Sequence, residues 1–214
     1  MAKSGAKEDP RITRSRSLIL DAASEAFLEF GYDGTSVDDI AARAGVAKRT
    51  VYNIYGEKEE LFRATLARSI AIAEQLAEIL AEATTRLDDV GKDLPALAIR
   101  LADDVLLSPV LPLRRLLISE SARFEDLARD YRDRAPDMVL RALAASFSDL
   151  RDRGLLVMDD PALAAEHFAF LVIGAELDRG MFTSAPPSPE QARRRAGEGA
   201  RAFLRAYGTH RPAS

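Results

Sequence analysis

Five polar side chains follow one another closely after Gly45, and their types suit contact with a nucleic acid. They are Lys48, Arg49, Thr50, Tyr52 and Asn53. Lysine and arginine neutralise phosphates and release their counterions. Arginine can also donate two hydrogen bonds to guanine, and asparagine can read adenine. Because hydroxyl groups can bond phosphates and touch thymine methyl groups, the segment has the composition of a surface that reads a DNA groove.

Two short helices joined by a tight turn would hold this surface outward. Thr35 and Ser36, followed by acidic residues, predict the start of the first helix. Gly45 supplies the positive φ that such a turn usually needs, and the small Ala41 fits where the helices cross. Apolar side chains would pack the two helices on each other: Ile40, Ala41, Ala44, Val46, Val51 and Ile54.

The rest of the chain also reads as helices. An apolar stripe at helical spacing runs from Leu18 to Phe30, and Gly31 is expected to end that helix as a left-handed cap. A long amphipathic helix is expected from Glu57 to about Thr84, and prolines start several later helices. Runs of alternating β-branched residues are absent. We therefore predict an all-α fold of about nine or ten helices.

Composition excludes several functional classes. The 214 residues are 47% hydrophobic and contain no cysteine and only two histidines, so a disulfide framework, a thiol nucleophile and a zinc site are not expected. No apolar run reaches the roughly eighteen residues that span a bilayer, and no signal peptide follows the basic N-terminus, which predicts a cytoplasmic protein without membrane contact. The net charge of −4 does not indicate nucleic-acid binding. The local charge does, because the segment from residue 43 to 58 contains four basic residues and only one acidic residue, Glu57. The basic residues are Arg43, Lys48, Arg49 and Lys58.

The segment from Thr35 to Phe62 closely resembles the DNA-binding domain of the tetracycline-repressor (TetR) family. The matching runs are Thr35-Ser36-Val37, Gly45-Val46, Thr50 to Tyr55 and Lys58 to Phe62, and the preceding helix with Ala22-Ala23, Phe27 and Gly31-Tyr32 matches as well. The stretch from Leu116 to Asp160 resembles, with less specific motifs, the AefR-type branch of the family's C-terminal domain.

The resemblance implies three parts of the chain. They are a flexible basic arm (1–12), a DNA-binding domain of three helices (13–62, with the helix-turn-helix at about 35–54) and an effector-binding and dimerisation domain (63–214). It also implies DNA-contacting positions: Thr35, Ser36, Arg43, Lys48, Arg49, Thr50, Tyr52, Asn53, Tyr55 and Lys58. Two residues depart from the family pattern. Ala47 replaces a frequent serine or threonine cap, which forfeits about 1 kcal/mol, and Glu57 replaces a frequent serine.

Dimerisation is expected from two C-terminal helices. The stretch from Leu163 to Ile173 is apolar nearly all round, so one face would pack on the chain's own core and another on a second copy. The last helix carries a stripe of small residues that ends in aromatics. The expected interface residues are Phe168, Leu171, Val172, Ala196, Ala200, Phe203 and Tyr207.

A small-molecule pocket is the least specified feature. Phe124, Phe147, Phe170 and Met181 are candidates for lining an apolar cavity, although each would also suit an ordinary core. His167 is expected to be a satisfied core or interface histidine. The effector expected by default is a small apolar or amphipathic molecule, and no cofactor or metal is expected.

The leading function is a homodimeric repressor that releases a palindromic operator when its effector binds. An activator of the same fold and a helical partner-binding protein are the alternatives. A small helical enzyme is disfavoured, because no nucleophile with a base, metal cluster or phosphate loop is evident.

Overall fold

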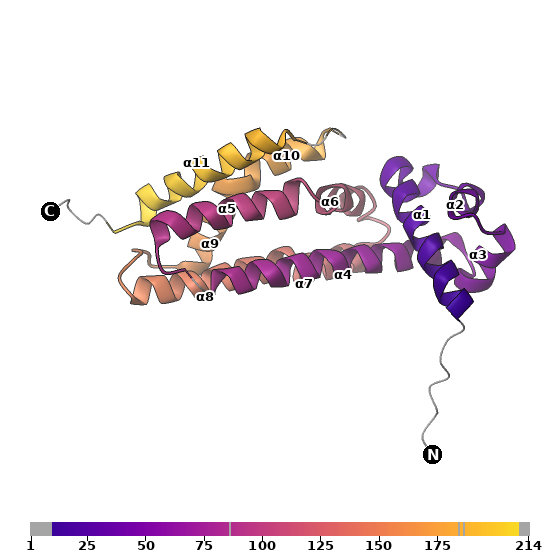
Figure 1. Ribbon diagram of the computed structural model, residues 1–214, viewed down its shortest axis with the longest axis horizontal. Helices are drawn as coiled ribbons and strands as arrows, with labels where there is room; N and C mark the ends of the chain where they lie inside the picture. The colour runs from indigo at the N-terminus through magenta and orange to yellow at the C-terminus, as the bar shows by residue number, and fades with distance from the viewer. Residues whose placement is uncertain (1–9, 86, 184, 186, 210–214) are drawn as a thin grey trace, which may run out of the picture. The chain divides into compact units, whose positions relative to one another are not determined.

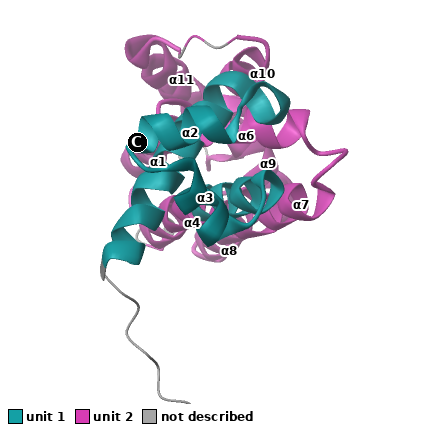
Figure 2. Cartoon of the chain, turned by 90° about the vertical axis from the view of Figure 1, so that its right-hand side faces the viewer, with its two compact units in different colours: residues 1–69 teal, residues 70–214 magenta. Residues whose placement is uncertain are grey.

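The chain is helical in nearly all of its described parts. The computed structural model describes residues 10–85, 87–183, 185 and 187–209 (Figure 1). Apart from one antiparallel bridge between Leu156 and Gly208, those residues contain no β-structure. The all-α fold predicted from the sequence is therefore confirmed. Two compact units divide the chain, residues 1–69 and residues 70–214 (Figure 2).

The first unit contains α1 (Pro10–Gly34), α2 (Val37–Ala44), α3 (Lys48–Tyr55) and the start of α4 (Lys58–Thr84). Of the expected flexible arm, residues 1–9 lie outside the described residues and residues 10–12 already belong to α1, which corrects its boundary. Its core is aromatic: the ring of Phe62 meets those of Phe27 and Tyr32 edge-on, with centroids 4.8 and 4.9 Å away. Gly31 has φ 72° and ψ −178°, so it kinks α1 and is not the expected left-handed cap.

The turn between α2 and α3 follows the predicted chemistry. The Ser36 side chain accepts a hydrogen bond from the backbone N–H of Asp39 and caps α2. Gly45 adopts the left-handed conformation (φ 65°, ψ 31°), and its N–H closes the helix on the carbonyls of α2. Ala41 and Val51 are buried where the helices meet. This local geometry turns the polar face of α3 outward.

The second unit comprises the remainder of α4 and the later helices. These are α5 (Val90–Leu106), α6 (Val110–Ser119), α7 (Glu125–Arg134), α8 (Pro136–Asp152), α9 (Pro161–Ala169), η1 (Phe170–Gly174), α10 (Ala175–Met181) and α11 (Pro189–Tyr207). The π-helical turn η1 joins α9 and α10 without a break, so the described residues form ten rods, namely α1 to α8, this run and α11. Prolines begin α8, α9 and α11 as expected, whereas Pro95 lies inside α5.

The core of the second unit centres on three phenylalanines from three helices. Phe147, Phe168 and Phe203 lie with ring centroids 5.1 to 5.7 Å apart. Helix α11 packs along α5 and against η1. Its contact with η1 is close, because a Cβ on Gly199 would lie 2.2 Å from the carbonyl oxygen of Leu171. Among the described helices, none has the length and hydropathy to cross a bilayer.

Candidate nucleic-acid interface and cavity

Helix α3 presents a polar face to solvent. Lys48, Arg49, Tyr52 and Asn53 are exposed and Thr50 is half-buried, while Val51 turns inward. The helix begins at Ala47, which has an extended backbone and no side-chain cap, so the first turn of α3 leaves its N–H groups without a capping side chain. Together these residues form a donor-rich face of about two helical turns.

Lys48 is already paired with an acid of α2. Its ammonium nitrogen lies 2.8 Å from a carboxylate oxygen of Asp38 and 5.9 Å from the centre of the Tyr52 ring. The hydrogen bond to Asp38 raises the pKa of Lys48, so the side chain stays charged. Both side chains are more than half exposed, which makes the pair weak and exchangeable.

Two further cations lie over aromatic rings of α1. The guanidinium of Arg43 stands 5.3 Å from the centre of Phe30 and bonds Glu29 at 3.2 Å. The ammonium of Lys58 lies 4.4 Å from the centre of the Tyr32 ring. Cations over ring faces are attracted by the ring quadrupole, so these contacts orient both side chains.

The hydroxyls of two predicted DNA-contacting residues, Thr35 and Tyr55, are buried, so the predicted DNA contacts of these two side chains are wrong. Thr35 is only 3% exposed, because its hydroxyl donates to the carbonyls of Ala26 and Gly31 at 3.1 and 2.8 Å. It ties α1 to the start of α2 and cannot bond a phosphate. The Tyr55 hydroxyl is buried without a hydrogen-bond partner among the described residues, and this burial raises its pKa. Ser36, by contrast, is exposed.

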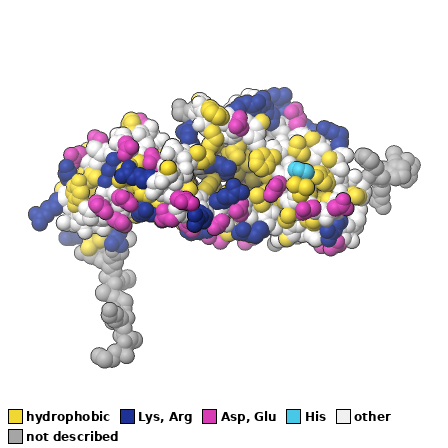
Figure 3. Space-filling model, turned by 180° about the vertical axis from the view of Figure 1, so that it is seen from behind, with side chains coloured by type: hydrophobic (Ala, Val, Ile, Leu, Met, Phe, Trp, Pro, Cys, Tyr) yellow, Lys and Arg dark blue, Asp and Glu magenta, His cyan; other side chains and the backbone are white. Residues whose placement is uncertain are grey.

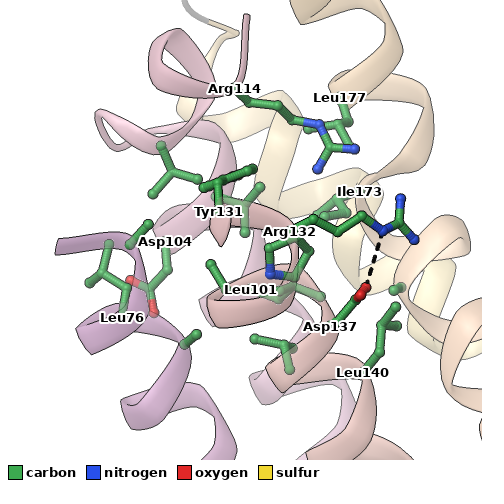
Figure 4. A pocket seen from close by; sticks show the side chains of 18 of the residues that line it. Leu76, Leu101, Asp104, Arg114, Tyr131, Arg132, Asp137, Leu140, Ile173 and Leu177 are labelled. Carbon is green, nitrogen blue, oxygen red and sulfur yellow. Dashed lines mark ion pairs between the residues drawn. The ribbon is translucent and has the colours of Figure 1, made fainter. Parts of the chain in front are cut away.

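The second unit contains a partly open cavity of about 380 Å³. Helices α4 to α9, η1 and α10 contribute to its wall (Figure 4). Most of the lining is apolar, including Leu76, Leu80, Leu101, Leu117, Val139, Leu140, Ile173 and Leu177. The volume lies in the range of pockets that hold small organic molecules.

A few polar groups interrupt the apolar lining. Asp104 Oδ2 is buried and lies 3.5 Å from Nε of Arg100, too far for a hydrogen bond. Tyr131 is 6% exposed; burial raises the pKa of its hydroxyl, and the charge and hydrogen bond of Arg114 partly offset that rise. Arg132 pairs with Asp137 at 3.4 Å.

Of the predicted pocket residues, Phe170 lines the cavity and the other three do not. Phe147 belongs to the aromatic core, and Phe124 is buried where α7 begins. Met181 is half-buried at the end of α10. Sequence reasoning missed the polar lining of Asp104, Arg114 and Tyr131. Asp104 and Arg114 each lie beside a residue of like charge, and Tyr131 lies in a strongly charged helix, so no local pattern marked them.

Most predicted dimer residues are buried within the chain itself, which corrects that prediction. Phe168, Val172, Ala196, Ala200 and Phe203 are at most 3% exposed, because α11 packs them on α5, α9 and η1. Leu171 is 47% exposed and Tyr207 is half-buried. His167 is exposed, and its Nδ1 lies 2.5 Å from the Tyr207 hydroxyl.

Apolar side chains remain exposed on the run from α9 to the end of α10. They are Leu163, Phe170, Leu171 and Phe182, at 47%, 69%, 47% and 85%. Figure 3 shows hydrophobic side chains gathered on one face of this unit, with lysine and arginine side chains around them.

The fold and the two sites define an all-helical helix-turn-helix protein with a cavity in its second unit. Residues 19–65 match bacterial regulatory proteins of the tetR family, and residues 92–209 match the C-terminal domain of AefR-like transcriptional repressors. The chain belongs to the TetR family of bacterial transcription regulators, in its AefR-like branch.

Solved and curated relatives agree with this assignment. A putative TetR-family transcriptional regulator from Mesorhizobium loti is 34% identical, with 94% of this chain and 100% of that chain covered and a TM-score of 0.77. The flavonoid-responsive regulator FrrA is 28% identical, with 92% and 99% covered and a TM-score of 0.62. The transcriptional activator FasR from Mycolicibacterium smegmatis is 44% identical over 61 residues, 28% of this chain and 27% of its own length. The chain matches only 25–34% of the length of such curated relatives.

Proposed function

We propose that this protein is a homodimeric transcription repressor that binds a palindromic operator and leaves it when a small apolar or amphipathic effector enters the cavity. The exposed polar face of α3 carries this proposal. It combines two cations with an amide and a phenol on a helix that the α2–α3 turn holds outward. The protein would act in the cytoplasm, where operator DNA is reached.

The residues of this face divide by the DNA group that they would contact. Arg49 and Asn53 can donate to guanine and adenine edges in the major groove. The phosphate contacts would come from side chains around them: Ser36, Arg43, Lys48, Thr50, Tyr52 and Lys58. Two such helices about 34–36 Å apart would enter successive major grooves.

A second copy would cover the exposed apolar face of the run from α9 to α10. Leu163 and Leu171 are each 47% exposed, and the charged side chains of Arg194 and Glu198 on α11 are also exposed. An apolar centre with a polar rim is the usual composition of an interface between protein chains. In a dimer with two-fold symmetry, both copies would contribute this same patch to the interface.

Helix α4 supports coupling between the cavity and the DNA-binding face. Its first turns bury Leu61 and Phe62 in the core of the first unit, and Leu76 and Leu80 further along line the cavity. A ligand against those residues would favour one position of the helix. The coupling that TetR-like induction needs is about 1–3 kcal/mol, which a shift of one packed helix can supply.

The test is DNA binding to the protein's own upstream region, measured by fluorescence anisotropy at several salt concentrations. Lys48→Ala and Arg49→Ala should each weaken binding, and Lys48→Ala should also flatten the dependence of affinity on salt, because it removes a phosphate contact. Arg129→Ala is the matched control, because Arg129 is an exposed arginine of α7 that lies outside α3. Equal binding by all the variants would contradict the proposed interface and favour a helical partner-binding protein.

The direction of regulation needs a separate experiment. The family description of residues 92–209 is that of repressors, whereas FasR is named an activator. Transcription from the bound promoter, measured in vitro with and without the protein, should fall when the protein is added. A rise would identify an activator.

A further inference from the structure

One cation of the cavity wall lacks a balancing acid. Among the described residues, Arg132 is paired with Asp137 and Asp104 lies within 3.5 Å of Arg100, whereas no ion pair is found for Arg114. Figure 4 shows Arg114 and Arg132 on one side of the cavity and Asp104 with Leu76 on the other. The charged groups around the cavity therefore leave an excess of positive charge at the Arg114 end.

The Arg114 end also offers hydrogen-bond donors that remain usable. Arg114 lies close enough to Tyr131 for its charge to lower the pKa of that hydroxyl. A guanidinium has five N–H groups that can donate to a ligand. The Tyr131 hydroxyl can likewise donate its O–H to a ligand. Because Tyr131 is 6% exposed and burial raises its pKa, the hydroxyl keeps its proton at neutral pH.

A neutral apolar ligand would be a poor occupant of this cavity. It would displace water from Arg114 without supplying a counter-charge, and covering an unpaired charge is unfavourable. A cationic ligand would add repulsion at the same end. A ligand oxyanion would neutralise Arg114 and accept from both donors.

We propose that the effector is an amphipathic organic acid, whose apolar body lies against Leu76, Leu101 and Ile173 and whose carboxylate binds Arg114 and the Tyr131 hydroxyl. This inference rests on the proposed effector role of the cavity and narrows the ligand to one chemical class. It also gives two of the missed polar residues, Arg114 and Tyr131, a common role.

The test compares acids with amides and amines of the same apolar body by calorimetry. The probes are 4-biphenylcarboxylate, 4-biphenylcarboxamide and 4-biphenylmethylamine, together with dodecanoate and dodecanamide. At least one acid should bind about tenfold or more tightly than its amide, the size of a charge-assisted hydrogen bond. If no acid binds, or if an amide or the amine binds as tightly as the acid with the same apolar body, the proposal is wrong.

Variants then locate the acid. Arg114→Met keeps an apolar stem and should weaken acid binding about tenfold while leaving amide binding nearly unchanged. Arg114→Lys should restore part of the preference, and Tyr131→Phe should reduce it several-fold without altering the fold seen by circular dichroism. Arg129→Met, on α7 but outside the cavity wall, is the control. An acid preference that survives Arg114→Met would overturn the assignment.

Operator release is measured separately, so that the two proposals can fail independently. An acid that binds through Arg114 but does not release operator DNA contradicts the effector role and leaves the ligand class standing. Release by the amides alone contradicts the ligand class and leaves the effector role standing.

Discussion

Lys48 lies on the proposed DNA-binding face, but its side chain is already held in an ion pair. Its ammonium is bound to Asp38, so contact with a phosphate requires exchange of one anion for another. Asp38 is itself exposed beside the proposed phosphate path, where its charge would repel the backbone.

We therefore expect Asp38→Asn to strengthen operator binding. Loss of an exposed ion pair and of a repelling carboxylate should raise affinity about two- to fivefold, measured by anisotropy at low salt. Glu125→Gln removes one negative charge from an exposed pair on α7 and should leave affinity unchanged. Weaker binding by Asp38→Asn would mean that Asp38 mainly positions α3.

Two glycines of α11, Gly197 and Gly199, have different surroundings, so replacing each by alanine should change the stability of the protein in opposite directions. A Cβ on Gly199 would lie 2.2 Å from the carbonyl of Leu171 in η1, whereas one on Gly197 would meet only the end of Arg201 at 3.6 Å. Gly199→Ala should destabilise the protein by about 1–3 kcal/mol through overpacking. Gly197→Ala should stabilise it by about 0.5–1 kcal/mol, since alanine favours a helix. Denaturant unfolding of both variants measures this difference, and equal effects would contradict the close contact.

A second stability prediction concerns the start of α3. Ala47 has the extended backbone of an N-cap without a side-chain acceptor, whereas Ser36 caps α2. Ala47→Ser should raise the free energy of unfolding of the first unit by about 1 kcal/mol, and Ser36→Ala should lower it by a similar amount. Thermal unfolding followed by circular dichroism would reveal both. No gain from Ala47→Ser would show that solvent already satisfies these N–H groups.

Assembly of two copies belongs to the scale of the whole molecule. The buried faces of α9 and α11 are used inside one chain, so the exposed Leu171 side chain is the sharper site for a test. Leu171→Arg should convert the proposed dimer to a monomer in analytical ultracentrifugation and reduce operator affinity, because a monomer contacts one half-site only. Ile79→Arg places the same charge on α4, where the side chain is 43% exposed, and should leave the dimer intact. A dimer that survives Leu171→Arg would place the interface elsewhere.

Tertiary structure decided the features that depend on distant segments. Thr35 and Tyr55 lie in the predicted motif, yet their hydroxyls turn into the first unit. The polar wall of the cavity joins Asp104 of α5, Arg114 of α6 and Tyr131 of α7, which no local spacing connects. Phe203 illustrates the general reason: a helical apolar stripe indicates burial but does not say whether the chain's own core or a second copy covers it.

Sequence alone was sufficient where a structure depends on neighbours within one or two turns. The all-α class, the long α4, the Ser36 cap and the left-handed Gly45 all follow from local propensity and sterics. The outward face of α3 follows too. Val51 is buried where α3 packs on α2, so the polar residues on the opposite side of the helix, Lys48, Arg49 and Asn53, are exposed to solvent. The cavity and the fate of the apolar faces required the packed helices, since both arise from contacts between residues far apart in the chain.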